Sequence, residues 1–280
     1  MDGRLLGSGG TADVYEYHGN KVLKLYQDRY AKDIVEWEYI KTKAAYDYGL
    51  PAPRVYEVIQ CNGRYGLVMD RIFGHSLFEV LAAQITGPGL GGESSIENSL
   101  FVDSIKKTAH LLNQLHNMSV HVTDTAESAL RRGVIGTNLL TESEKRSVLD
   151  IISSLPQGAS VCHGDPNPFN IIDTGSSYML IDWVNCVQGS VLYDIAEYVL
   201  MFKYIEFHKN TYPEIVKYVV QYKNFFIDIF LFEYKILSKD DLSTLELWTI
   251  PMLASKLSGS GDQTYLSMAL EEVRRLLRQL

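Results

Sequence analysis

The chain has 280 residues, of which 46% are hydrophobic and 21% are charged. These proportions are ordinary for a globular protein and exclude an intrinsically disordered chain. The net charge of −8 is uneven, because residues 1–70 hold 9 Lys/Arg and 10 Asp/Glu whereas residues 71–280 hold 17 and 24. Without a strong basic stripe, a nucleic-acid partner is not expected. The excess negative charge of residues 71–280 either attracts a cationic ligand or serves only solubility.

The cysteines and the hydropathy pattern indicate the compartment. The three cysteines, at positions 61, 162 and 186, are odd in number and widely spaced, which is typical of a reducing compartment. The amino terminus lacks the basic lead and apolar run of a signal peptide. The most apolar stretch, residues 218–234, is interrupted by polar and charged side chains. We expect a cytoplasmic protein with no membrane partner, and the sequence leaves the oligomeric state unknown.

Residues 4–70 show the alternation and turn signals of strands. Strands are expected over residues 5–6, 14–17 and 21–26, and as a hairpin over residues 55–60 and 65–70. Residues 33–48 contain no glycine or proline and precede Gly49, so they are expected to form a helix. These elements predict a small five-stranded antiparallel sheet with one helix.

After residue 72 the pattern changes to that of helices. Helices are expected over residues 76–85, 96–117 and 141–154, with four more between 193 and 280, a glycine-rich loop at 86–92 and a hairpin at 171–173 and 178–182. The sequence predicts a bilobal α+β fold, with a β-rich N-lobe over residues 1–72 that ends in a hinge and a helical C-lobe over residues 73–280. A cleft between two such lobes commonly binds ligands.

The stretch from His163 to Asn170 reads His-Gly-Asp-Pro-Asn-Pro-Phe-Asn, and Ile-Asp-Trp follows at residues 181–183. It supplies two carboxylates, Asp165 and Asp182, and the carboxamide of Asn170. A carboxylate can orient an attacking hydroxyl, and oxygen ligands can hold Mg²⁺ against phosphates. Alternatively, Asp165 and Asn170 only form turns in a proline-rich loop. That alternative explains the residue types, but it does not explain why His-Gly precedes Asp165 or why Ile-Asp follows at residues 181–182.

A glycine cluster lies between the first two expected strands and comprises Gly7, Ser8, Gly9, Gly10 and Thr11. Such a loop lets backbone N–H groups approach phosphate oxygens closely. Hairpins also use glycines, so this motif alone leaves both interpretations open. The strand–loop–strand context, without a Gly-Lys-Ser/Thr ending, argues against a Walker-type loop.

Lys24 stands inside the apolar strand Val-Leu-Lys-Leu. A buried lysine needs a partner, which the phosphates of a nucleotide and a glutamate of the following helix would supply. An exposed lysine on an edge strand would need neither. The glutamate is either Glu38 or Glu36, and Glu38 is favoured because it points nearer the packed face of the helix.

Residues 65–72 resemble a strand that ends at a hinge between lobes. Main-chain groups of Asp70 and Ile72 would there read an adenine base, with Met69 as the apolar wall. This prediction comes from position, because recognition by backbone groups leaves little signature in a sequence.

Together these motifs resemble the aminoglycoside phosphotransferase/choline kinase-like family of small-molecule kinases. The resemblance extends over nearly the whole chain, at residues 6–15, 22–26, 49–53, 67–70, 115–116, 163–170, 181–183 and 193–196. It implies a bilobal protein-kinase-like fold, with ATP or GTP as phosphoryl donor, Mg²⁺ as cofactor and a hydroxyl of a small molecule as acceptor. The N-lobe would bind the nucleotide, and the C-lobe would hold the catalytic loop and the acceptor site.

The resemblance also implies a role for each residue of the catalytic loop. Asp165 would be the catalytic aspartate, and Asn170 and Asp182 would ligate Mg²⁺. Asp194 would anchor the loop and His163 would brace it. Two further histidines on one helix, His110 and His116, are expected in the core or in support of the loop.

Two departures from protein kinases indicate a small acceptor. Gly164 replaces the arginine that reads a phosphorylated activation loop, and the segment from Asp182 to Asp194 is too short for a peptide platform. The acceptor would be an aminoglycoside-like antibiotic or a metabolite. It would be cationic if acids such as Glu197 and Glu206 face it. These acids, like Asp194, can instead be structural. A catalytically silent nucleotide-binding pseudokinase or interaction module is the alternative, and a phosphohydrolase is a third.

Overall fold

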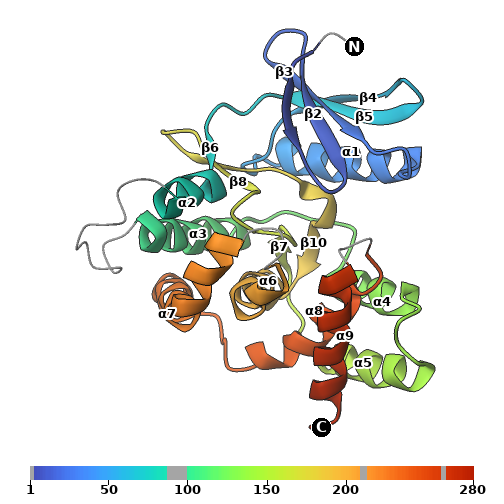
Figure 1. Cartoon of the computed structure of the whole chain (residues 1–280), viewed down its shortest axis with the longest axis vertical. Helices are drawn as coiled ribbons and strands as arrows, with labels where there is room; N and C mark the ends of the chain where they lie inside the picture. The colour runs from blue at the N-terminus through green and yellow to red at the C-terminus, as the bar shows by residue number, and fades with distance from the viewer. Residues whose placement is uncertain (1–2, 87–99, 209–212, 260–262) are drawn as a thin grey trace. The chain divides into compact units, whose positions relative to one another are not determined.

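The computed structural model describes residues 3–86, 100–208, 213–259 and 263–280 (Figure 1). By their internal contacts the residues form two compact units. The first comprises the chain up to Phe78 together with residues 168–186, and the second comprises residues 79–167 and 187–280. The first unit thus includes a segment that the sequence prediction placed in the helical lobe.

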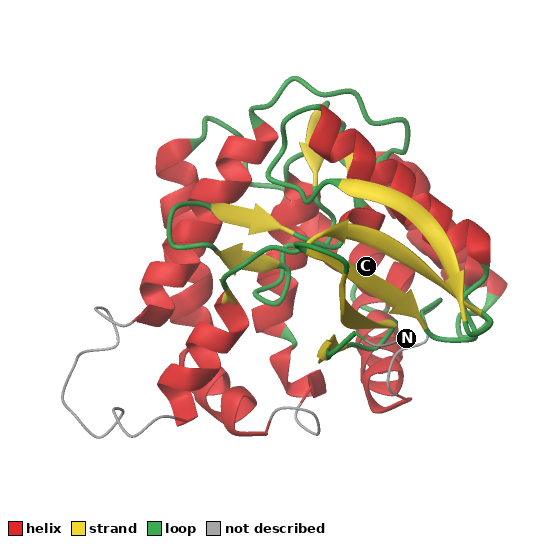
Figure 2. Cartoon of the chain, turned by 90° about the horizontal axis from the view of Figure 1, so that it is seen from above, coloured by secondary structure: helices red, strands yellow, loops and turns green. Residues whose placement is uncertain are grey.

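A five-stranded antiparallel sheet dominates the first unit, which confirms the predicted α+β class. The strands are β1 (Leu5–Ser8), β2 (Ala12–Tyr17), β3 (Lys21–Tyr26), β4 (Val55–Cys61) and β5 (Arg64–Asp70), in the spatial order β1-β2-β3-β5-β4. Helix α1 (Lys32–Asp47) packs against β4 and β5. Gly49, with φ of +75°, follows the helix in the left-handed conformation that glycine adopts without strain. The strands twist along their length (Figure 2).

The alternation of side chains along β3 sets the two faces of this sheet. Val22 and Tyr26 pack into a core that includes Val35 of α1, whereas the leucines at positions 23 and 25 pack into a second cluster. Lys24 lies between Val22 and Tyr26 and therefore projects toward the helix side of the sheet.

A second sheet explains why residues 168–186 belong to the first unit. Strands β6 (His75–Ser76), β8 (Ile171–Asp173) and β9 (Tyr178–Leu180) pair in that order, and the 3₁₀ helix η2 (Trp183–Asn185) follows. The hairpin of β8 and β9 was predicted. Leu180 N also donates to Pro51 O at 2.7 Å. Helix α2 (Leu77–Thr86) starts directly after β6 and contains the boundary between the units.

The second unit is mostly helical, as predicted (Figure 1). Its elements are α3 (Leu100–His116), α4 (Ala126–Gly136), α5 (Glu142–Ser154), β7 (Ser160–Cys162), β10 (Val187–Gly189), α6 (Leu192–Lys203), η3 (Ile205–His208), α7 (Pro213–Leu237), η4 (Leu245–Trp248), α8 (Thr249–Lys256) and α9 (Gln263–Leu277). Most of α6 is buried, and it packs against α7 and α8. Strands β7 and β10 form an antiparallel pair. Within the described ranges, no helix is both long and apolar enough to cross a membrane.

Some elements of the second unit differ from the sequence prediction. Helix α4 was not predicted, since two glycines lie in its last turn and a half. One of them, Gly133, is required by packing, because a Cβ there would lie 2.5 Å from Ser255 O of α8. The short strands β7 and β10 were also missed. Most of the expected loop at 86–92 and the start of the helix expected at 96 lie outside the described residues.

Candidate functional site

Lys24 is held by two carboxylates within the first unit. Its Nζ donates to both carboxylate oxygens of Glu38 at 2.9 Å and lies 3.1 Å from Asp182 Oδ1. The side chains of Lys24 and Glu38 are 12% and 1% exposed. Glu36, the other candidate, instead pairs with Lys32 on the surface. The structure thus brings Lys24, Glu38 and Asp182 together and leaves Glu36 outside the cluster.

Burial makes the charges of this cluster interact strongly. Burial lowers the pKa of Lys24, but the carboxylates of Asp182 and Glu38 more than reverse this effect, so the ammonium form is favoured. Burial also raises the pKa of Glu38 to about 7, because the ammonium of Lys24 offsets the loss of hydration only in part and Asp182 adds a second negative charge. Two carboxylates thus share one cation.

Local backbone structure fixes the position of Asp182. The residue has φ of +66° and immediately precedes η2, whose Trp183 is fully buried and donates from Nε1 to Leu180 O at 2.8 Å. Ile181 N donates to Asn170 O at 2.9 Å, so the backbone segments that hold Asn170 and Asp182 lie side by side. Asn170 is itself buried. The structure therefore brings together the two residues predicted to ligate Mg²⁺.

The glycine loop joins β1 to β2 and leaves its backbone accessible. Positions 7–11 are exposed, and a Cβ at Gly7 or Gly10 would meet no atom within 4 Å. Positive φ angles are absent from the glycines of this loop, and Gly9 has room for a Cβ as well. The hairpin therefore does not require these glycines for its own conformation, and close approach of a ligand to them stays a prediction.

Two side-chain contacts brace the glycine loop. Ser8 Oγ donates to Asp13 Oδ1 at 2.7 Å across the hairpin, and Arg29 Nη2 donates to Gly10 O at 2.8 Å. The carboxylate of Asp13 also accepts from Arg64 Nη2 at 3.0 Å. The hydrogen bonds from Ser8 and Arg64 lower the pKa of Asp13, so its carboxylate is ionised at neutral pH.

The hinge residues predicted from position lie at the end of β5. Met69 is buried and pairs in register with Val22, so it faces the same side of the sheet as Lys24. Asp70 closes the strand, and its Oδ1 accepts from Tyr56 Oη at 2.8 Å. Ile72 follows the strand and is partly buried. Met69 thus lies on the side of the sheet that carries Lys24, and its role as an apolar wall stays a prediction.

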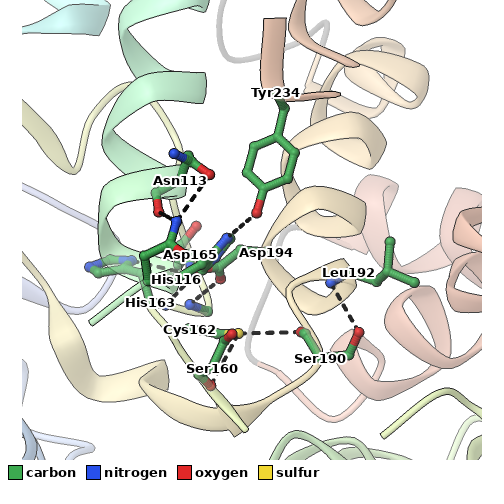
Figure 3. A network of polar contacts seen from close by, with 12 residues as sticks. Asn113, His116, Ser160, Cys162, His163, Asp165, Ser190, Leu192, Asp194 and Tyr234 are labelled. Atoms are coloured by element: carbon green, nitrogen blue, oxygen red, sulfur yellow. Dashed lines mark hydrogen bonds and ion pairs between the residues drawn. The ribbon is translucent and has the colours of Figure 1, made fainter. Parts of the chain in front are cut away.

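In the second unit, Asp194 of α6 anchors the loop that contains Asp165 (Figure 3). Asp194 is fully buried, and its two carboxylate oxygens accept from His163 N and Gly164 N, each at 2.7 Å. Gly164 has φ of +83°, a conformation that favours glycine. Asp194 thus has the anchoring position that the sequence predicted.

A buried chain of side chains supports this anchor. His116 Nε2 lies 3.1 Å from Asp194 Oδ2, and His116 Nδ1 lies 2.7 Å from the hydroxyl of Tyr234 (Figure 3). The sequence predicted that His116 lies in the core or supports the loop. It did not reveal the contact of His116 with Tyr234, because α7 contains many aromatic residues whose role is packing alone. The same expectation was wrong for His110, whose side chain is 49% exposed and contacts Glu233 at the surface.

Asp165 is oriented by its own loop. Asn167 Nδ2 donates to Asp165 Oδ1 at 2.7 Å, and Asp165 N donates to His163 Nδ1 at 3.3 Å. His163 is fully buried, so it braces the loop as expected. Asn167 therefore holds the carboxylate of Asp165, and His163 holds its backbone N–H.

The buried trio of His116, Cys162 and Asp194 has ligand atoms within 4.8 Å of one another. Hydrogen bonds nevertheless account for this cluster: both ring nitrogens of His116 and both oxygens of Asp194 have partners, and Cys162 Sγ donates to Ser190 O at 3.4 Å. The trio fits the anchor of the loop, and no metal is needed to explain it.

A family model described as the phosphotransferase enzyme family (APH) matches residues 2–207. The chain therefore belongs to the phosphotransferase enzyme family and is a small-molecule phosphotransferase, as the resemblance had implied. A comparison with curated protein sequences gave no match.

Solved structures confirm the fold over the length of the chain. A putative fructosamine-3-kinase from Haemophilus somnus is 13% identical, with a TM-score of 0.62 and coverage of 99% of this chain and 91% of the other. A choline/ethanolamine kinase family protein from Mesorhizobium loti is 18% identical, with a TM-score of 0.52 and coverage of 99% and 88%. The streptomycin–ATP–APH(2″)-IIa ternary complex is 13% identical, with a TM-score of 0.56 and coverage of 98% and 91%. At these identities the likeness establishes the fold.

Proposed function

We propose that the chain is an ATP- or GTP-dependent, Mg²⁺-requiring enzyme that phosphorylates a hydroxyl of a small molecule. The observation that carries the proposal is Lys24, an ammonium inside an apolar sheet that two carboxylates hold in place. Any buried lysine needs an acidic partner, but here two carboxylates face one ammonium, and one of them is almost fully buried. A lysine that binds phosphates must remain charged and fixed before the nucleotide arrives.

The nucleotide would bind through the first unit. Backbone N–H groups of the glycine loop and Lys24 would contact the phosphates, and main-chain groups of Asp70 and Ile72 would read the base against Met69. In this proposal, residues 1–72 act as the nucleotide-binding lobe, and residues 73–280 carry the catalytic loop and acceptor site. One solved relative is a ternary complex with ATP and streptomycin, which supports ATP as the donor.

The residues present fit a bound Mg²⁺. Asp182 Oδ1 is buried, and Lys24 Nζ lies 3.1 Å from it. The cluster also holds two carboxylates against one ammonium, so a further cation would offset its negative charge. Asp182 and Asn170 would supply oxygen ligands of the type that Mg²⁺ prefers. When bound, the metal would neutralise charge on the phosphates.

Asp165 would act on the acceptor. Its carboxylate would orient the hydroxyl and accept its proton while the hydroxyl oxygen forms a bond to the γ-phosphorus. The bond from that phosphorus to the β,γ-bridging oxygen would break, which releases the nucleoside diphosphate. The two hydrogen bonds that orient Asp165 support this role, since a general base needs a fixed position.

The acceptor is a small hydroxylated molecule, either an aminoglycoside-like antibiotic or a metabolite, and we place the reaction in the cytoplasm, where free cysteines such as the three in this chain persist. One solved relative is a complex with streptomycin. Two others are a putative fructosamine-3-kinase and a choline/ethanolamine kinase family protein. These names support a small acceptor with a hydroxyl.

The proposal is tested by measuring nucleotide consumption by the purified chain with a panel of hydroxylated metabolites and antibiotics. We expect at least one acceptor to stimulate consumption and to yield a phosphorylated product by mass spectrometry, only with Mg²⁺ present. Nucleotide binding without transfer to any acceptor would contradict the proposal and favour a silent pseudokinase. Slow hydrolysis that no acceptor changes would favour a phosphohydrolase.

A further inference from the structure

An arginine is fixed at the tip of the glycine loop by a carbonyl group. Arg29, in the turn between β3 and α1, donates from Nη2 to Gly10 O at 2.8 Å. Gln27 N donates to Thr11 O at 3.0 Å, so the backbone of this turn is also bound to the glycine loop. Arg29 is exposed, and no carboxylate in the described part of the chain forms an ion pair with it. Its guanidinium thus has a fixed place without an acidic partner.

The nearby acids belong to another arginine. Asp13 accepts from Arg64 Nη2 at 3.0 Å, and Asp28 Oδ1 lies 3.6 Å from Arg64 Nε. The side chain of Arg64 is 21% exposed and also donates to Tyr26 O at 2.6 Å. Because both carboxylates are engaged by Arg64, the positive charge of Arg29 stays available to an anion that approaches the glycine loop.

Two tyrosine rings connect Arg29 with Lys24. The Cζ atom of Arg29 lies 5.2 Å from the centroid of the Tyr30 ring. The rings of Tyr30 and Tyr26 have centroids 5.6 Å apart, and Lys24 Nζ lies 5.3 Å from the centroid of the Tyr26 ring. Both tyrosines pack into the core on the helix side of the sheet. An aromatic ring attracts a cation within about 6 Å of its centroid, so the rings hold both cations on the side of the sheet where phosphates would bind.

The register of β3 gives the order of these groups along the sheet. The strand starts at Lys21, which pairs with Asp70 at the proposed hinge, and ends at Tyr26, with Lys24 between them. Arg29 lies beyond that end, at the tip of the glycine loop. A nucleotide whose base lies at the hinge and whose phosphates reach Lys24 would therefore extend its terminal phosphate toward Arg29.

We propose that Arg29 binds the terminal phosphate of the nucleoside triphosphate and thereby distinguishes it from the diphosphate. The proposal rests on the proposed function, because it assumes that the nucleotide lies along the glycine loop. The bonds to Gly10 O and, at 3.5 Å, to the hydroxyl of Tyr30 both come from Nη2. The N–H groups of Nε and Nη1 therefore remain for phosphate oxygens. Once the terminal phosphate has been transferred, this contact is lost and the diphosphate is held less tightly.

Isothermal titration calorimetry tests the proposal through the Kd of ATP, ADP and AMP, each with Mg²⁺, for the full chain and for Arg29→Met. We expect the wild type to bind ATP more tightly than ADP. In Arg29→Met the Kd for ATP should rise about tenfold or more, because a charge-assisted hydrogen bond to phosphate is lost. The Kd values for ADP and AMP should stay nearly unchanged, because these nucleotides lack the terminal phosphate.

Two further variants separate recognition from a structural role. Arg29→Lys keeps the positive charge and should keep part of the preference for ATP. Arg54→Met is the matched control, because the guanidinium of Arg54 also lies over a tyrosine ring, 5.1 Å from the centroid of Tyr56, but Tyr56 packs on the other side of the sheet. This control should leave every Kd unchanged.

Two results would overturn the proposal. An equal rise of the Kd for ATP and for ADP in Arg29→Met would mean that Arg29 only braces the glycine loop. An unchanged Kd for ATP would mean that Arg29 contacts no phosphate. A wild type that binds ATP but transfers phosphate to no acceptor would instead contradict the proposed function.

Discussion

At the scale of single residues, the buried ammonium of Lys24 is the feature on which the proposed nucleotide site depends. A charge inside an apolar sheet is unfavourable unless neighbours offset it, and Glu38 and Asp182 both do so. The pair with Glu38 cannot relax into solvent, since Glu38 is 1% exposed. The lysine is therefore already fixed and charged, so little reorganisation would be needed if it binds phosphates as proposed.

Lys24→Met tests this assignment. We expect kcat/KM for the nucleotide to fall by about 100-fold or more, because a fixed donor to the phosphates is lost. Removal of the cation also leaves two carboxylates facing each other, which should destabilise the fold by about 3–5 kcal/mol in urea unfolding. Lys32→Met is the matched control, since Lys32 pairs with the exposed Glu36, and it should change stability by less than about 1 kcal/mol. Equal effects of the two substitutions would contradict the assignment.

The raised pKa of Glu38 predicts a pH dependence of stability. The folded state holds the proton of Glu38 more tightly than the unfolded state, in which the pKa is about 4.5. The contribution of Glu38 to the free energy of unfolding is therefore largest below about pH 4.5 and is lost as the pH rises through about 7. Compared with Glu38→Gln, the wild type should lose stability over this window in urea titrations. A difference between the two proteins that does not change from pH 4.5 to 7 would refute the shift.

At the scale of elements, the parts with strong local signals could be predicted. The alternation along β2 to β5 and the glycine after α1 are signals carried by neighbouring residues. The residue order from His163 to Asn170 led to the prediction of a catalytic loop. Helix α4 could not be predicted, because the glycine at 133 is there for contact with Ser255 across the fold. Tyr234 was likewise missed, since it contacts a residue far away in the sequence and stands in no motif.

The support of the loop by Tyr234 can be tested by Tyr234→Phe. The substitution removes a buried hydroxyl that lies 2.7 Å from His116 Nδ1, so we expect a loss of about 1–3 kcal/mol in stability. Because His116 orients Asp194 and Asp194 holds the loop, kcat should fall while the KM for the nucleotide stays constant. Tyr222→Phe, on the same helix, is the control and should leave kcat unchanged. A change in nucleotide KM alone would argue against the chain of contacts.

The capping box of α5 gives a prediction without any effect on chemistry. Thr141 Oγ1 accepts from Glu144 N, and the carboxylate of Glu144 accepts from Thr141 N. Thr141→Ala should cost about 1 kcal/mol of stability, measured by thermal unfolding, with normal turnover. Ser143→Ala in the same turn should be neutral. A loss of activity in Thr141→Ala would mean that α5 has a role beyond the stability of the second unit.

At the scale of the whole molecule, nucleotide and metal should stabilise the chain together. A ligand at about 100 times its Kd adds about 2.7 kcal/mol to the free energy of unfolding. We expect ATP with Mg²⁺ to raise the melting temperature more than ATP with EDTA, and Asp182→Asn to remove the difference. A metal-dependent shift that persists in Asp182→Asn would place the metal at other ligands.

The most direct test of the account is the transfer of labelled γ-phosphate from ATP to an acceptor by the wild type and by Asp165→Ala, with the Kd for ATP and Mg²⁺ measured on the same samples. If Asp165 accepts the proton of the attacking hydroxyl, transfer should fall by a factor of about 100 to 10,000 while the Kd stays within about threefold. Transfer by Asp165→Ala within a few-fold of the wild type would contradict the account.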